Sequence, residues 1–198
     1  SFPEGSSIAP DGHLLIWCNH PSDAPGLHAG FELSPEGGFL FLTNLSGAQI
    51  DTASYGLQVA DLSISKNGRN WNLTAPTPGN PNGPSVPLAS QSNLTINEWV
   101  TNRIAGEGDW LELYNRDTSH PVALRNLYLT SGEAVYRYGA ISFVAPRGFK
   151  RFWADEGSGP AHLGFRIPAA GGSLQLIQSN GVLIETLRHT AQGENLAS

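Results

Sequence analysis

Histidine and cysteine are the side chains of this 198-residue sequence with the most versatile chemistry, and they are sparse. His28 and His162 occupy matching positions of an internal repeat, which would suit metal ligands or protonation switches. Neither stands near another matched His, Cys or carboxylate, as a metal site requires, so we expect each ring to pack beside a phenylalanine and bond to backbone. Ala154 takes the place of Cys18 in the second copy, which indicates a small buried hydrophobe rather than a reactive thiol.

Carboxylates offer one candidate for an oxygen-ligand cluster, formed by Glu98, Asp109 and Glu112. Calcium prefers such ligands, yet the sequence has no Asp-x-Asp-x-Asp array with a glycine at the turn. In the alternative interpretation, Glu112 faces solvent on an alternating strand while the other two acids end strands or bond to loop amides. The sequence thus predicts no cofactor and no metal, with calcium at these three residues as the open alternative.

Signatures of catalysis are missing from the sequence. Gly-x-Ser-x-Gly, His-Glu-x-x-His and a phosphate-binding glycine-rich loop do not occur. Ser, His and Asp residues are dispersed along the sequence, so no stretch combines a nucleophile with a base. We therefore predict that the chain is not an enzyme.

Aromatic side chains offer a further kind of site, because their rings stack on sugars and on protein partners. Four of them lie in weakly constrained settings and are our candidates for a partner surface: Trp71, Trp99, Tyr136 and Tyr138. Trp17 and Trp153 are matched in the repeat and end apolar strands, so we expect these two to pack in a core.

The charge balance narrows the choice of partner. With 17 acidic and 11 basic residues the net charge is −6, which disfavours nucleic acid as the main ligand. No apolar run approaches the roughly 20 residues of a membrane-spanning helix. Protein stays the favoured partner, and a glycan remains open.

The element that positions all these residues is a repeat. The stretch from Ile8 to Leu42 recurs between Val144 and Leu176, first at an offset of 136 and, after a two-residue deletion, at 134. Matched positions carry Gly, Pro, Trp and His, which chance rarely produces, so two copies of one structural module are expected. Residues 94–136 have no counterpart ahead of the first copy. We expect the back part of a first module at 1–75, a Pro/Gly/Ser-rich linker at 76–92, a second module at 93–198, and a longer parent polypeptide.

The segments between turns are short and apolar, and none has a sustained helical period. Strands are predicted at 13–18, 27–33, 39–43, 49–55, 62–65, 71–74, 94–100 and 110–114, with 39–43 well buried. This rhythm is typical of an all-β sandwich or barrel.

Three successive motifs carry a resemblance to a known family. They are Ile96-Asn97-Glu98, then Gly108-Asp109-Trp110-Leu111-Glu112-Leu113-Tyr114-Asn115, then Val122-Ala123-Leu124-Arg125-Asn126-Leu127-Tyr128-Leu129-Thr130. They resemble the opening of a bacterial lamin-tail domain, and the Trp71 to Gly83 stretch is similar to the family's ending. Asn126-Leu127 stands where that family usually has Gly-Trp. The resemblance implies an immunoglobulin-like β-sandwich without a catalytic apparatus, of the kind found beside other domains in large secreted or surface proteins.

These observations lead to one expected function and one alternative. We expect a non-enzymatic structural or adhesive module of a secreted or cell-surface bacterial protein that contacts copies of itself or neighbouring domains. Residues 1–64 lack a front half that residues 94–136 of another copy would supply, so strand complementation into filaments or oligomers is the sharper hypothesis. The alternative is an accessory module that targets a larger extracellular enzyme to glycan, nucleic acid or the cell envelope.

Overall fold

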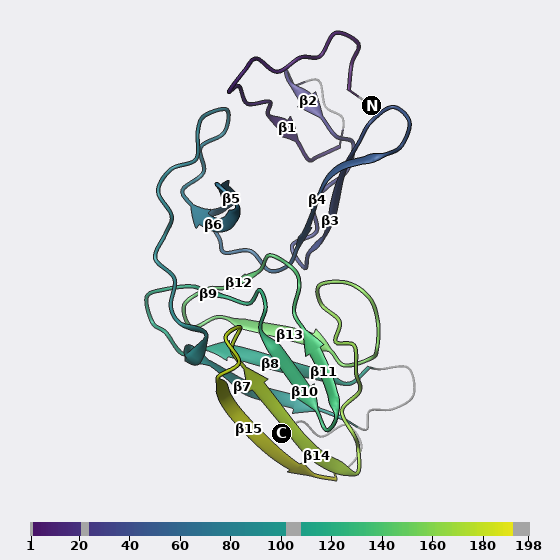
Figure 1. The fold of residues 1–198 in the computed structure, drawn as a ribbon, viewed down its shortest axis with the longest axis vertical. Helices are drawn as coiled ribbons and strands as arrows, with labels where there is room; N and C mark the ends of the chain where they lie inside the picture. Colours follow the sequence, from purple (N-terminus) through teal and green to yellow (C-terminus); the bar gives the residue numbers. More distant parts are fainter. Residues whose placement is uncertain (1, 21–23, 102–107, 192–198) are drawn as a thin grey trace. The chain divides into compact units, whose positions relative to one another are not determined.

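The computed structural model describes residues 2–20, 24–101 and 108–191, and it is almost entirely β-structure (Figure 1). The one helical element of this described part is a single 3-10 turn, Gln91–Asn93. None of its helices has the length and hydropathy needed to cross a membrane. The all-β prediction is therefore confirmed.

The described residues form two compact units that do not follow the repeat. One unit comprises residues from 1–34 and 61–86, and the other comprises residues from 35–60 and 87–198. Part of the first copy, residues 35–60, thus belongs to the same unit as the second copy.

The larger unit contains two antiparallel sheets that share one core. Their strand orders are β13-β8-β7 and β11-β10-β14-β15. The bounds are β7 (Leu94–Val100), β8 (Trp110–Asn115), β10 (Tyr128–Ser131), β11 (Ala134–Arg137), β13 (Phe149–Trp153), β14 (Gly171–Ile177) and β15 (Leu183–Thr190), and a two-stranded sheet adds β9 (Val122–Ala123) and β12 (Phe143–Val144). Leu113 of β8, Leu129 of β10 and Leu174 of β14 all lie in one buried cluster, as expected for a sandwich-like arrangement.

Local sequence pattern explains why these segments form strands. Leu111 and Leu113 are buried while the residues between and beside them are less so, which is the alternation predicted for 110–114. One carboxylate joins the two sheets: Glu185 Oε2 of β15 accepts hydrogen bonds from Thr95 Oγ1 (2.8 Å) and Ile96 N (2.9 Å) of β7.

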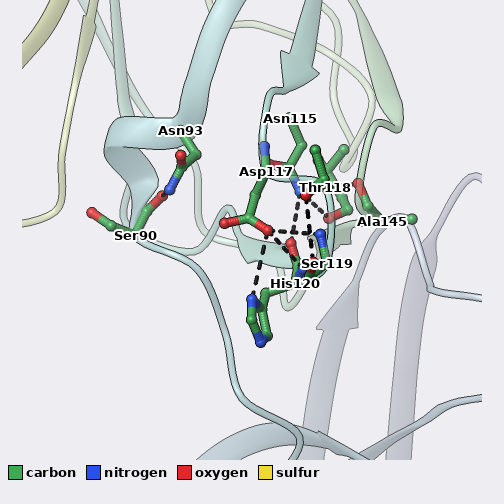
Figure 2. Close-up of polar contacts among 9 residues, drawn as sticks. Ser90, Asn93, Asn115, Asp117, Thr118, Ser119, His120 and Ala145 are labelled. Atoms are coloured by element: carbon green, nitrogen blue, oxygen red, sulfur yellow. Dashed lines mark hydrogen bonds and ion pairs between the residues drawn. The ribbon is translucent and has the colours of Figure 1, made fainter.

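The asparagine that ends β8 is buried and closes the following turn. Asn115 Nδ2 donates to the carbonyls of Val144 (3.2 Å) and Ala145 (3.0 Å), as Figure 2 shows for Ala145. Its Oδ1 accepts from Asp117 N, and Asp117 Oδ1 in turn accepts from the backbone N–H groups of Ser119 and His120. Those two backbone donors lower the pKa of Asp117. The network is a side-chain-capped turn of the kind that Asn and Asp commonly form.

A hairpin from the first copy belongs to this larger unit. It pairs β3 (Gly38–Thr43) with β4 (Gln49–Tyr55). We call it the uncovered hairpin, because several of its large apolar side chains are exposed. Ile141 holds its base, because Ile141 N donates to Ser54 O (2.8 Å) and Gly56 N donates to Ile141 O (2.9 Å). Gly56 has no room for a side chain, since a Cβ there would collide with the Tyr138 hydroxyl.

The smaller unit contains two short strand pairs. β1 (Ile16–Trp17) pairs in parallel with β2 (Leu27–His28), and β5 (Ser63–Asn67) forms a hairpin with β6 (Asn70–Thr74). Part of the predicted linker bonds to this hairpin: Asn82 Nδ2 donates to Lys66 O (2.9 Å) and Val86 N to Leu73 O (2.7 Å).

The backbone geometry shows the repeat at atomic detail. The β3–β4 and β14–β15 hairpins have the same register at an offset of 134, including a bulge after Leu42 and after its counterpart Leu176. Trp17 pairs in parallel with His28, and Trp153 with His162. The hairpin register and the parallel Trp–His pairing therefore recur between the two copies in the described residues.

Two expectations about burial in the first copy are wrong. The strand predicted as well buried exposes Phe39 by 55% and Phe41 by 63%, and Trp17, expected in a core, is 48% exposed. The reason is the absence of neighbours: in the described part, β3 pairs only with β4, and β1 only with β2. The same lack of pairing shortens the strands predicted at 13–18 and 27–33 to two residues each.

Candidate functional site

The three acids considered for calcium do not assemble into a ligand set. Glu98 and Glu112 face each other across β7 and β8, and Glu112 Oε1 accepts a hydrogen bond from Asn97 Nδ2 (2.7 Å). Asp109 precedes β8, where its backbone carbonyl accepts from Ala154 N (2.8 Å). Within residues 2–20, 24–101 and 108–191, no three His, Cys, Asp or Glu side chains gather in a way that would hold a metal ion. The geometry gives calcium no ready site there.

The matched histidines do have matched side-chain partners, which the sequence analysis overlooked. His162 Nδ1 lies 2.9 Å from Asp155 Oδ1, and His28 Nδ1 lies 2.7 Å from Asn19 Oδ1. Asn19 and Asp155 are themselves related by the repeat offset of 136, so the signal was present in the sequence. What concealed it was the change from an amide to a carboxylate between the two copies.

The partners indicate that these rings fasten loops. Asp155 Oδ1 also accepts from Gly157 N (2.9 Å), and His28 Nε2 lies 3.0 Å from Ala24 O. Burial raises the pKa of Asp155, but the hydrogen bonds from His162 and Gly157 outweigh it, and the net pKa is lowered. Because a neutral amide fills the same place in the first copy, the arrangement does not need a charged partner. A loop clasp fits both copies, whereas a general base oriented by a carboxylate fits only one.

This clasp leads to a prediction in which the first copy supplies the control. Asp155→Asn, which reproduces Asn19, should leave the free energy of unfolding at pH 7 nearly unchanged, whereas Asp155→Ala should lower it by about 1 kcal/mol. The lowered pKa of Asp155 means that its contribution is present above the unfolded value of 3.8 and is lost as the pH falls through the folded value. Urea unfolding at neutral and acidic pH measures both effects. Equal losses for the two substitutions would contradict the clasp.

The four aromatic candidates for a partner surface are less accessible than expected. Tyr138 is fully buried, with its ring edge against Phe152 at 5.3 Å between centroids, so its assignment to a surface is wrong. Its burial arises because it follows β11 and covers the core between the two sheets. The other three are half-buried: Trp99 lies beside His189, burial raises the pKa of Tyr136, and the Lys66 ammonium lies over the Trp71 ring.

A buried lysine escaped the sequence analysis. Lys150 is a buried residue of β13 in the larger unit. Its Nζ lies 3.7 Å from Glu36 Oε2 and 5.5 Å from the Phe152 ring centroid. Burial lowers the pKa of Lys150, and the nearby Glu36 carboxylate acts in the opposite direction. Alternation along Phe149 to Phe152 places Lys150 on the same face as Phe152, which was the available signal. The ion pair ties β13 to the residue just ahead of the uncovered hairpin.

The most unusual surface lies on the uncovered hairpin. Phe39 and Phe41 stack at 6.2 Å between ring centroids, and Leu42 and Ile50 are also exposed on this hairpin. Most exposed large apolar side chains of the described residues belong to the first copy: Phe2, Ile8, Leu14, Leu15, Ile16, Trp17, Phe31, Leu33, Phe39, Phe41, Leu42, Leu45 and Ile50. On the uncovered hairpin, Phe39, Phe41, Leu42 and Ile50 supply exposed apolar surface of the kind that marks interaction sites in soluble proteins.

The second copy shows what the same hairpin looks like when it is covered. Leu42 is 43% exposed, whereas its counterpart Leu176 is fully buried. Ile50 is exposed, but its counterpart Ile184 packs against the core. Two things distinguish the hairpins: β14 pairs with β10 on the edge that β3 leaves open, and the apolar face of β14 packs in the core cluster with leucines of β7 and β8. We therefore take the uncovered hairpin as the candidate functional site.

Comparison of the chain with protein-family models, with curated proteins and with solved structures finds no match in any of the three. The fold and the site define an all-β module with an exposed apolar hairpin.

Proposed function

We propose that this chain is a non-enzymatic structural or adhesive module of a secreted or cell-surface bacterial protein, and that it acts through protein–protein contacts. The observation that carries the proposal is the uncovered hairpin, where Leu42 is exposed although its counterpart Leu176 is buried, and where Phe39 and Phe41 are exposed as well. An apolar strand with an open edge is a template for pairing with another strand. Pairing of this kind with a strand from another molecule would join the chain to a partner in an oligomer or filament.

We also propose that the modules are lamin-tail-like immunoglobulin-like sandwiches. The change from glycine to Asn126 in the family's third motif is compatible with this, because Asn126 has a φ of +65°. That left-handed conformation suits glycine and is tolerated by asparagine, so Asn126 can take the place of the family's glycine without strain. The buried Asn115 accounts for the asparagine that ends the second motif.

The proposal is tested on the protein isolated from its natural source. Hydrogen exchange of residues 38–55 is measured in the native assembly and in the isolated chain, with electron microscopy of the same sample. We expect strong protection of these residues in the native assembly alone, together with regular particles. Equal exchange in both states would contradict protein–protein contact at this hairpin.

An accessory targeting module is the second candidate, and one observation favours it. Trp17 is 48% exposed and offers an open ring on which a sugar can stack. Glycan-array binding that disappears in Trp17→Ala, while the uncovered hairpin stays unprotected in the native protein, would favour this candidate over the first.

A further inference from the structure

We propose that β3 is the docking edge for a strand with the chemistry of β10, supplied by a polypeptide segment outside the described residues that resembles the front half of the second copy. This inference rests on the proposed function and specifies its partner. The second copy acts as an internal template, because its covered hairpin has the same register as the uncovered one.

The template defines which residues the partner strand would face. In the second copy, Leu129 of β10 lies opposite Leu176 and Ser131 lies opposite Leu174, and both β14 leucines are buried. Their first-copy counterparts are Leu42 and Leu40 on β3. Since β3 pairs only with β4 within the described residues, its other edge is open to the same antiparallel pairing. A partner strand would carry a leucine opposite Leu42.

A carboxylate supplies a second point of attachment. Glu185 lies opposite Leu176 and accepts hydrogen bonds from Thr95 and Ile96, so it binds the first strand of the front half to the hairpin. Asp51 holds the corresponding place opposite Leu42, is exposed, and accepts from the adjacent Thr52 N (2.8 Å) through Oδ1. A carboxylate has room for several donors. A partner with a hydroxyl and a backbone N–H like those of Thr95 and Ile96 would satisfy it.

The outer face adds a feature that the template lacks. Phe39 and Phe41 stand where the second copy has Ser173 and Gln175, and Gln175 lies opposite Thr130 of β10. A β-branched residue at the Thr130 position of the partner would therefore pack on Phe41, a favourable cross-strand pair. We therefore expect four successive residues in the partner strand: an aromatic residue, a leucine, a β-branched residue and a small residue. Tyr128 to Ser131 of β10 have this pattern.

The number of strands shows that the occupant lies outside the described residues. The described chain has one β10 and two hairpins of the β14 type, and its β10 is already paired with its own β14. If a second copy donated its β10 to β3, its own β14 would lose that partner, so one unpaired strand edge would remain for each chain. Only a front-half segment that lacks a competing hairpin completes the first copy.

The probe is a synthetic peptide of residues 126–137, which spans β10 and β11, added to the full chain. The covalently attached β10 has a high effective concentration at β14, so the free peptide should bind at β3. We expect saturable binding by calorimetry and new hydrogen-exchange protection at residues 38–43. Leu42→Asp in the chain should weaken binding at least about tenfold, because the partner leucine would meet a charge. Leu45→Asp, in the exposed loop of the same hairpin, is the matched control and should change nothing.

Paired substitutions in the peptide and in the chain distinguish a direct contact between the two strands from a general loss of structure. A peptide with Leu129→Lys should bind the Leu42→Asp chain better than the original peptide does. Absence of binding, protection of β14 instead of β3, or a full-chain dimer that Leu42→Asp dissolves would each overturn the inference. Protection of residues 38–55 in the native assembly, combined with any of these results, would leave the proposed function standing and remove only this partner.

Discussion

Replacing Phe152 with alanine is expected to lower the free energy of unfolding by about 3–5 kcal/mol. The Phe152 ring is fully buried on β13, where it contacts the edge of Tyr138 and lies below the Lys150 ammonium. Truncation would remove this buried surface and leave a cavity between the two sheets. Because domains of this size are stable by only about 5–15 kcal/mol, much of the total would be lost. Urea unfolding followed by tryptophan fluorescence measures the change.

The uncovered hairpin offers the matched control for this substitution. Phe41→Ala removes the same side chain from a position that is 63% exposed, and should alter stability by no more than about 0.5 kcal/mol. A loss comparable to that of Phe152→Ala would mean that the hairpin is covered in the isolated chain. That outcome would also remove the main support for the proposed function.

Raising the pH from 10 to 12 is expected to remove roughly 2–3 kcal/mol of stability through Tyr138 alone. Burial raises the pKa of Tyr138 from 10.0 to about 12, because an ionised phenolate is poorly solvated in the core. In the unfolded chain the phenol ionises near 10, so the unfolded state gains stability across this range while the folded state stays protonated. Stability is fully present below pH 10 and is lost as the pH rises toward 12.

The Tyr138→Phe substitution removes this contribution and so isolates it. The difference between the wild type and Tyr138→Phe should shrink or change sign between pH 9 and 12 when both are unfolded with urea. Tyr114→Phe, on β8, controls for the loss of a phenol elsewhere in the chain. Parallel stability curves for the wild type and Tyr138→Phe would contradict the burial of this hydroxyl.

The repeat gives these predictions a shared logic, because each copy is a control for the other. Asn19 shows which substitution Asp155 should tolerate, and Leu176 shows how the counterpart of Leu42 is buried in a completed core. Differences between the copies are then more informative than either copy alone. They point to the hairpin, where polar Ser173 and Gln175 face outward in one copy and two phenylalanines do in the other.

Local sequence pattern was sufficient to predict the strand class, the repeat and its register. Alternation at 110–114 depends only on which side chains fall on each face of a strand, so it could be read without a structure. Matched glycines recur with the same backbone conformation, as Gly37 and Gly171 show with φ values of +114° and +105°. Backbone positions with such positive φ values favour glycine, so the same glycines recur in both copies and the repeat can be recognised in the sequence.

Burial depended on tertiary structure, because it depends on neighbours that are distant in the sequence. An apolar run predicts a buried strand, yet β3 and β14 share one register and differ in exposure, because only β14 pairs with β10 and packs its leucines in the core cluster. The same non-local cause placed Tyr138 and Lys150 inside the unit, although one was assigned to a surface and the other was not noticed. The sequence by itself determined which segments repeat and form strands, and the tertiary structure decided how the strands pair and which copy of the hairpin is covered, because both depend on contacts between residues distant in the sequence.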